Sequence, residues 1–370
     1  MKSVLDRWWT QAAAGVLRRA LSGLVHDQID LVEGGRCQSY GRPGGLSCTV
    51  TVHDPRFYRR VLLGGSLGAA ESWIDGEWTC DDLVSLVRIA LRNQATLVRL
   101  DSSWSWLRRL AAAVQHLGRR NTRRGARKNI QEHYDLGNDF FALMLDETLS
   151  YSCAIFPHPE ASLHQASLAK LERVCRKLEL KPEDHVLEIG TGWGGLALFA
   201  ASRYGCRVTT TTISPAQYRL ARERVVQAGL ADRVEVLLAD YRDLTGQYDK
   251  LVSIEMIEAV GYEYFETFFR KCASLLHPWG RMLLQAIVIR DPLFAQHRHS
   301  VDFIRTHIFP GGCLPSITAL GEAMQRACDL RLVHLEEMSA HYVRTLAAWR
   351  QRFVDNLDQV RALGYSERLI

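Results

Sequence analysis

The chain has 370 residues, of which 47% are hydrophobic and 24% are charged, and its formal net charge is +5. This composition is typical of a soluble globular protein, and the length suffices for two domains. No stretch reaches the roughly 20 consecutive apolar residues that cross a bilayer as a helix, so an integral membrane protein is not expected.

The N-terminal region predicts a small α+β domain over residues 1–107. Its first 24 residues indicate an amphipathic helix that carries Trp8 and Trp9, and they resemble a signal peptide only weakly because polar residues interrupt the apolar stretch. Residues 46–52 (LSCTVTV) have the alternation of a strand, and residues 81–93 (DDLVSLVRIALRN) have the period of a helix. No catalytic cluster is recognisable in this domain.

The nine cysteines indicate reduced thiols. Their number is odd, and no two of them stand as a CxxC pair. We therefore expect neither a disulfide framework nor a zinc site, and we predict no metal. Free thiols are typical of cytosolic proteins, so a cytoplasmic protein is the simplest interpretation.

A basic linker is expected at residues 108–128, with eight Arg or Lys side chains and no acidic one. Such a block can attract an anionic membrane, or it can be a solvated linker, and both interpretations stay open. The sequence lacks the aromatic signature of an RNA-binding domain, so nucleic acid is not an expected partner.

Residues 129–370 predict an α/β domain with a parallel sheet, because strand patterns alternate with helix patterns. The expected strands are residues 185–190, 206–213, 233–240, 249–255 and 281–289, and the expected helices are residues 196–204, 215–229 and 262–276.

The sequence GTGWGG (190–195) follows the first of these strands and matches G-x-G-x-x-G through Gly190, Gly192 and Gly195. In this context the motif predicts a nucleotide-type loop, although a tight strand-to-helix turn would explain it as well. A dinucleotide fold would place an acid at the end of the second strand. That strand ends in TTTTIS, whereas Glu188 precedes the loop and Asp240 ends the third strand. This arrangement favours S-adenosylmethionine (SAM) over NAD.

Several long motifs in one order carry a specific resemblance. The chain resembles the cyclopropane-fatty-acyl-phospholipid synthase family, whose catalytic domain is similar to that of the mycolic acid cyclopropane synthases. The resemblance covers residues 45–370 and lies in these stretches: GSLGAAESWIDGEWTCDDL (65–83), HYDLGNDFFALMLDETLSYSCAIF (133–156), VLEIGTGWGGLALFAA (186–201), TTISPAQ (211–217), DYRDL (240–244), EMIEAVG (255–261), FIRTHIFPGG (303–312) and HYVRTLAAW (341–349).

The resemblance implies a Rossmann-like class I SAM methyltransferase domain, with a mostly parallel seven-stranded sheet, behind a small lipid-binding α+β domain. It implies methylene transfer from SAM to the cis double bond of an unsaturated acyl chain in a membrane phospholipid. The alkene takes the methyl group, a carbocation results, and a base closes the cyclopropane ring by removing a proton. In the family this base is a bound bicarbonate ion. Homodimers and peripheral attachment to the inner face of an anionic membrane are also implied.

By the same resemblance, Glu258 holds the bicarbonate. Its partners are Cys153, Tyr342 and Ile287, with Gln285 where many members have His. Taken without the family, Cys153 is more often an inert buried thiol than a site residue, and Tyr342 is a routine aromatic on a helix face. For Glu258, a helix-capping acid and a site residue are equally good interpretations. Glu255 is interpreted as secondary, because its position is often not acidic in the family.

The cofactor residues that the resemblance implies fall into three groups. Tyr151 and Ser152 contact the methionyl part, Gly190 and Gly192 lie beneath it, and Glu188 supports the loop. Thr212 and Gln217 lie around the ribose and the amino-acid tail. Asp240, Tyr241 and Arg242 contact the adenine end. His133 and Tyr134 close a lid, for which packing is an equally good explanation.

The sequence departs from the family pattern in two places. Gln285 can donate a hydrogen bond to an anion, but it cannot titrate. In the family, a helical stretch that contains a Cys normally follows the segment that resembles YSERLI (365–370), and this sequence does not contain it. Neither Cys313 nor Cys328 is assigned the role of that Cys.

Three alternatives stay open. The cation could lose a different proton and give a methyl-branched chain. The acceptor could be a soluble amine or hydroxyl compound. The protein could also be a lipid-binding protein without activity.

Overall fold

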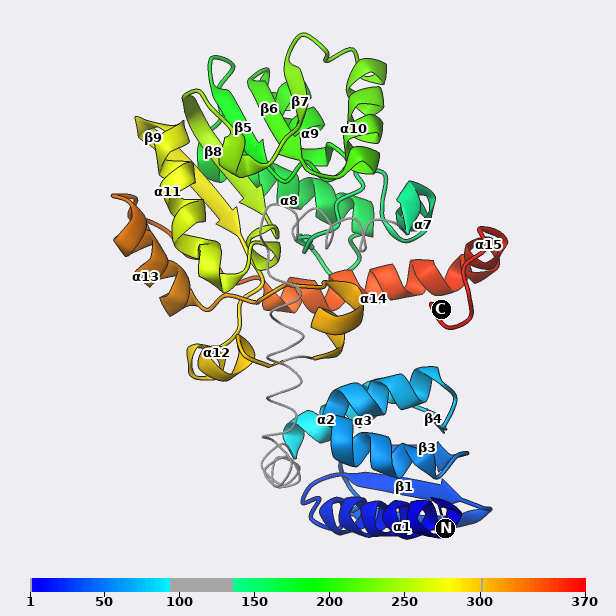
Figure 1. Ribbon diagram of the computed structural model, residues 1–370. Coiled ribbons are helices and arrows are strands. Elements are labelled where there is room, and N and C mark those ends of the chain that lie inside the picture. Colours follow the sequence, from blue (N-terminus) through cyan, green and yellow to red (C-terminus); the bar gives the residue numbers. More distant parts are fainter. Residues whose placement is uncertain (1, 94–135, 301) are drawn as a thin grey trace. The chain divides into compact units, whose positions relative to one another are not determined.

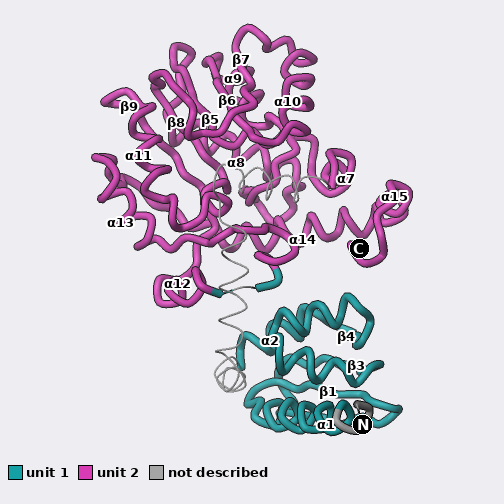
Figure 2. The backbone as a smooth tube through the Cα atoms, in the orientation of Figure 1, with its two compact units in different colours: residues 1–115, 300–303 teal, residues 116–299, 304–370 magenta. Residues whose placement is uncertain are grey.

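The computed structural model describes residues 2–93, 136–300 and 302–370. The chain divides into two compact units, residues 1–115 with 300–303 and residues 116–299 with 304–370 (Figure 2). The predicted basic linker, residues 108–128, and the predicted lid residues His133 and Tyr134 lie outside the described residues. The two predicted domain boundaries at the linker therefore stay predictions.

The first unit contains a four-stranded sheet in the order β2-β1-β3-β4. Its strands are β1 (Gln28–Glu33), β2 (Arg36–Gly41), β3 (Ser47–Val52) and β4 (Trp78–Cys80), and its helices are α1 (Lys2–Leu21), α2 (Arg56–Ile74) and α3 (Leu83–Arg92). In β3 every second residue is buried, which is the pattern that predicted a strand. At α3 the side chain of Asp82 accepts a hydrogen bond from the Ser85 N–H and so caps the helix. The predicted strand and helix of this region are confirmed.

The second unit contains a five-stranded sheet in the order β7-β6-β5-β8-β9, and each neighbouring pair is parallel. Its strands are β5 (His185–Ile189), β6 (Arg207–Thr212), β7 (Val234–Leu238), β8 (Tyr248–Ile254) and β9 (Leu276–Gln285). Its helices are α7 (Gly137–Met144), α8 (Leu163–Leu178), α9 (Gly195–Tyr204), α10 (Pro215–Gln227), α11 (Phe265–Leu275), α12 (Asp291–His297), α13 (Ile317–Ala327), α14 (Ser339–Asp355) and α15 (Leu357–Ala362), as Figure 1 shows.

Helices cover both faces of this sheet, and alternate residues of each strand enter one of two cores. Val186 of β5 and Val252 of β8 pack with α8 and α9. Leu187 and Ile189 of β5, with Leu251 of β8, pack with α11 and α13. Burial on both faces explains why these strands read as nearly continuous apolar runs, and it confirms the predicted parallel α/β domain.

Two details of the prediction differ from the structure. The described residues form five parallel strands in this sheet, where the resemblance implied seven. After α13, residues 328–338 form no strand, and Leu332, Val333 and Leu335 are exposed, so this segment does not extend the sheet beyond β9. Strand β9 also begins and ends earlier than expected, so Ile287 lies beyond its end.

Two features concern the class of protein. Among the described residues no helix has the length and apolar character needed to cross a membrane. The nine cysteines are free thiols, and five of them are fully buried within the second unit.

Candidate active site

Several of the predicted site residues lie at the carboxyl ends of the parallel strands, which meet at one edge of the sheet. The glycine loop follows β5, Thr212 ends β6 and Gln217 follows it, and Asp240 follows β7. Glu255 and Glu258 follow β8, and Ile287 follows β9. Residues from five separate stretches of sequence are thereby brought to one edge.

Within the glycine loop, the backbone at Gly192 faces open space. Gly190 and Gly192 have φ values of +104° and +53°, a region that favours glycine. A Cβ atom added at Gly192 would meet no atom of the described residues within 4 Å, whereas one at Gly195 would lie 2.6 Å from the Thr148 carbonyl oxygen. Gly192 therefore fits a close approach by a cofactor, and Gly195 is needed for packing.

Glu188 lies inside the core instead of facing the loop. Its carboxylate is buried and accepts a hydrogen bond of 2.6 Å from the Thr210 hydroxyl, which in turn lies 2.8 Å from the Thr191 hydroxyl. Burial raises the pKa of Glu188 to about 7, and the Thr210 hydrogen bond and the charge of Lys170 oppose this shift. Glu188 can support the loop through the two threonines.

The residues predicted for the ribose end, and two of those predicted for the adenine end, hydrogen-bond in pairs. The Thr212 hydroxyl donates to the Gln217 side chain at 2.8 Å, and both residues are buried. Asp240 accepts three hydrogen bonds from the backbone and guanidinium of Arg242, the shortest being 2.6 Å. Tyr241 packs edge-on against Phe268, and its buried hydroxyl has no hydrogen-bond partner among the described residues.

Tyr151 and Ser152 lie on the segment between α7 and α8. The Tyr151 ring lies 5.1 Å from the Trp349 ring and 5.3 Å from the Phe141 ring, centroid to centroid. The Ser152 hydroxyl accepts a hydrogen bond of 3.0 Å from Lys170, whose ammonium group is buried. Burial lowers the pKa of Lys170, and the charges of Glu255, Glu188 and Asp146 oppose this.

The structure places Glu255 among the residues that were predicted to be catalytic, Cys153, Gln285 and Tyr342. One carboxylate oxygen, Oε1, accepts hydrogen bonds from the Cys153 N–H and from the Gln285 amide, both at 2.8 Å. The other oxygen, Oε2, accepts one from the Tyr342 hydroxyl at 3.3 Å. Burial raises the pKa of Glu255, and these hydrogen bonds and the charge of Lys170 oppose the shift.

Glu258 lies one short turn further along and has fewer partners. Its Oε1 accepts a hydrogen bond of 2.5 Å from the Ile287 N–H. Its Oε2 is buried and has no hydrogen-bond partner among the described residues. Burial, with the neighbouring charge of Glu255, raises the pKa of Glu258 to about 8, and the hydrogen bond from the Ile287 N–H opposes this shift.

The Cys153 thiol is not an activated nucleophile. Its Sγ lies 3.4 Å from the Ala154 carbonyl oxygen and 3.8 Å from that of Met338. Burial, with the charge of Glu255, raises the pKa of Cys153 to about 12. A neutral thiol at physiological pH serves as a packing and hydrogen-bonding group.

Sequence reasoning missed the positioning residues of this cluster. On α14, the Thr345 hydroxyl accepts from the Ala154 N–H at 3.1 Å, and His341 Nδ1 accepts from the Phe156 N–H at 3.2 Å. Together with Tyr342 they lie within one turn of α14, a spacing that could have indicated a shared face. Lys170 could have been found as a charge among the apolar positions of α8.

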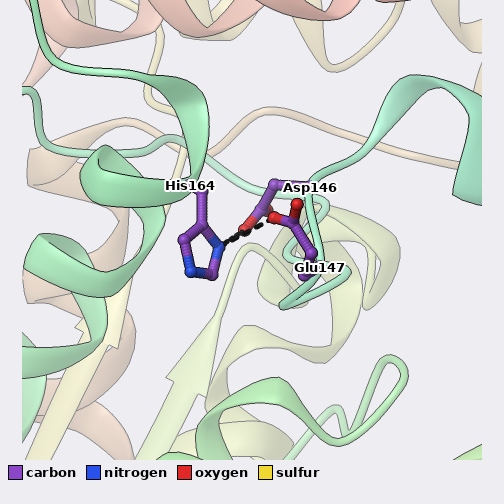
Figure 3. A group of neighbouring side chains, drawn as sticks. All are labelled: Asp146, Glu147 and His164. Atoms are coloured by element: carbon purple, nitrogen blue, oxygen red, sulfur yellow. Dashed lines mark hydrogen bonds and ion pairs between the residues drawn. The ribbon is translucent and has the colours of Figure 1, made fainter.

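The described residues also contain one group that could hold a metal ion, Asp146, Glu147 and His164 (Figure 3). His164 Nδ1 lies 3.0 Å from an Asp146 oxygen and 2.9 Å from a Glu147 oxygen. Asp146 also accepts hydrogen bonds from the Thr148 and Ser167 hydroxyls. These hydrogen bonds and ion pairs account for the group without a metal ion.

The glycine loop with its open position and the polar groups around it fit SAM. The backbone of Gly190 and Gly192 would lie against SAM, and Tyr151 would face the methionyl part of SAM. This fit rests on the open space at Gly192 and on the shared edge of the sheet.

Comparisons with known proteins agree with this geometry. Tuberculostearic acid methyltransferase UfaA1 of Mycobacterium tuberculosis is 40% identical over 324 residues, which are 85% of this chain and 75% of that protein. The cyclopropane-fatty-acyl-phospholipid synthase of Escherichia coli K12 is 39% identical over 330 residues, which are 88% of this chain and 81% of that protein.

Among solved structures, mycolic acid cyclopropane synthase CmaA1 complexed with SAH and CTAB matches with a TM-score of 0.60 at 33% identity, over 64% of this chain and 86% of that chain. The model of the family described as mycolic acid cyclopropane synthetase matches residues 121–370. The chain therefore belongs to the mycolic acid cyclopropane synthetase family, and it is an enzyme of the SAM-dependent methyltransferases that modify lipids.

Proposed function

We propose that this protein transfers a methylene group from SAM to the cis double bond of unsaturated acyl chains in membrane phospholipids and forms cyclopropane fatty acids. The observation that carries the proposal is the buried carboxylate cluster beside the glycine loop. Met256, between the two carboxylates, lies 3.4 Å from the position of a Cβ on Gly190. The name of the Escherichia coli relative supports the substrate class.

The residues of the site suit a reaction that passes through a carbocation. When bound, SAM supplies an electrophilic methyl group. The rings of Tyr151, Tyr342 and Trp349 form an aromatic wall, with Trp349 centred 5.1 Å from Tyr151 and 6.4 Å from Tyr342. Aromatic faces attract a cation and exclude the water that would hydrate it. The carboxylate beside this wall can accept the proton whose loss closes the ring.

The resemblance also predicts bicarbonate as the base, held by Glu258 and its partners. This stays a prediction, as do a homodimer and attachment of the protein to the cytoplasmic face of an anionic membrane. Exposed Trp8 and Trp9 on α1 support the attachment, because Trp side chains favour membrane interfaces.

One observation favours a second candidate product. The relative with 40% identity is named as a methyltransferase of tuberculostearic acid, whereas the relative with 39% identity is named as a cyclopropane synthase. Both reactions begin with methyl transfer, and they differ in which proton the cation loses. A methyl-branched acyl chain is therefore the alternative product.

The experiment is to incubate the protein with SAM and vesicles of unsaturated phospholipid and to analyse the fatty acids by gas chromatography and mass spectrometry. We expect acyl chains one methylene heavier that contain a ring and no double bond. A methyl-branched chain would support the second candidate. Consumption of SAM without any change in the acyl chains would contradict both.

A further inference from the structure

The carboxylate of Glu255 accepts hydrogen bonds from groups that the resemblance assigns to binding bicarbonate. The Cys153 N–H and the Gln285 amide donate to Oε1 at 2.8 Å, and the Tyr342 hydroxyl donates to Oε2 at 3.3 Å. These donors come from the α7–α8 segment, the end of β9 and α14. They converge on a carboxylate of the chain itself, which has the same planar pair of oxygens as bicarbonate.

The remaining groups of the predicted bicarbonate site offer little to a second anion. The Ile287 N–H donates to Glu258, and the Cys153 thiol lies against the Ala154 and Met338 carbonyl oxygens. Glu258 Oε2, which has no hydrogen-bond partner within the described part of the chain, could make one contact, and a single contact does not hold an anion in a buried site.

Charge also disfavours a bound bicarbonate here. An anion among these donors would face the carboxylate of Glu255, and two like charges about 4 Å apart repel by roughly 4 kcal/mol at the effective dielectric constant of a protein. The buried ammonium of Lys170 already interacts with Glu255, Glu188 and Asp146. The residues of this site therefore do not fit bicarbonate as an additional group.

The backbone at Glu255 is strained, and strain of this kind concentrates at functional sites. Its φ is +47°, a conformation that favours glycine and that residues with a side chain adopt at an energetic cost. The turn directs the carboxylate back onto the Cys153, Gln285 and Tyr342 donors. Glu255 as a whole residue is half-buried.

We propose that Glu255 is the catalytic base of this enzyme and takes the place that bicarbonate has in the family. In this step the Glu255 carboxylate removes a proton from the transferred methyl group, and the electron pair of the broken C–H bond forms the new C–C bond of the ring. Glu255 becomes a neutral acid and releases the proton to water before the next turnover. This inference rests on the proposed function.

The activity test compares wild type with two variants in buffer freed of carbon dioxide and in buffer with added bicarbonate. Wild type is expected to be equally active in both. Glu255→Gln fills the same space without a base, so we expect at least a 100-fold loss of ring formation in both buffers. Glu255→Gly suits the positive φ and frees the donors, so bicarbonate is expected to restore part of its activity.

A binding test gives a readout that does not depend on turnover. Thermal unfolding is followed with bicarbonate against chloride at equal pH and ionic strength. We expect bicarbonate to raise the melting temperature of Glu255→Gly in a saturable way and to leave wild type unchanged. Glu322→Gln is the matched control, because Glu322 is an exposed partner of Arg326 outside the site.

Several results would overturn the proposal. These are a wild-type activity that requires bicarbonate, a saturable bicarbonate shift in wild type, an active Glu255→Gln, or a Glu255→Gly variant that binds SAM and is not rescued. If wild type modifies no phospholipid in either buffer, the proposed function fails, and the melting temperatures still decide whether Glu255 occupies the anion site.

Discussion

At the end of β8, two carboxylates stand three residues apart in different environments. Glu255 accepts three hydrogen bonds from distant parts of the chain, whereas Glu258 accepts one and has an oxygen without a partner among the described residues. Burial raises the pKa of both, and it raises that of Glu258 to about 8. Ionisation of this pair therefore depends on contacts that only the folded chain supplies.

The pKa of Glu258 leads to a prediction about stability. The native state keeps a proton that the unfolded chain has already lost between an ordinary pKa of 4.5 and the native value of about 8. The free energy of unfolding therefore falls as the pH rises through this window. We expect Glu258→Gln to lose this part of the pH slope and to be more stable than wild type at about pH 9, by on the order of 2 kcal/mol.

Urea unfolding at about pH 6 and about pH 9 measures this difference. Glu322→Gln, which changes an exposed carboxylate, is expected to keep the wild-type slope. An unaltered slope in Glu258→Gln would show that Glu258 is ionised at low cost in the folded protein.

At the scale of elements, the loop between β5 and α9 provides the space for the cofactor. Gly192 and Gly229 offer a matched pair, since both have a positive φ and neither has an atom of the described residues within 4 Å of an added Cβ. Gly192 lies in the loop after β5, and Gly229 follows α10. The same substitution thus tests the same backbone strain in two locations.

We expect Gly192→Ala and Gly229→Ala to lose similar stability, about 1 kcal/mol each, because alanine disfavours a positive φ. Only Gly192→Ala is expected to weaken SAM binding, at least tenfold, because its Cβ enters the space of the cofactor. Isothermal titration calorimetry with SAM measures both variants. Equal SAM affinities would mean that the cofactor does not approach this loop.

At the scale of the whole molecule, the candidate active site and the proposed membrane contact belong to different units. All the described residues of the candidate site belong to the second unit, and Trp8 and Trp9 belong to the first. Trp8 and Trp9 are 61% and 45% exposed, and their rings lie side by side with centroids 5.4 Å apart.

We expect the double substitution Trp8→Ala and Trp9→Ala to reduce binding to anionic phospholipid vesicles at least fivefold and to leave SAM affinity unchanged. Vesicle sedimentation measures this binding. Trp279→Ala is the control, because Trp279 is 83% exposed but lies in the second unit. An equal loss of vesicle binding in the control would contradict a specific role for α1.

Local patterns predicted most of the elements that frame the site. Strands β5, β6, β7 and β8 and helices α9 and α10 lie within a few residues of their expected bounds, because apolar periodicity and turn residues act over short distances. Helix α11 starts three residues later than expected, after two short 3-10 turns. The glycine loop was predictable for the same reason.

The sequence by itself determined the parallel α/β domain, the glycine loop and, through its motifs, the family. Only the tertiary structure decided which of the two carboxylates accepts hydrogen bonds from Cys153, Gln285 and Tyr342. Cys153 and Glu255 are 102 residues apart, and Tyr342 is 87 residues from Glu255, so no local pattern relates them. The fold also brings Lys170 beneath the cluster and turns Glu188 into the core. These roles depend on distance and burial, which exist only once the chain has packed.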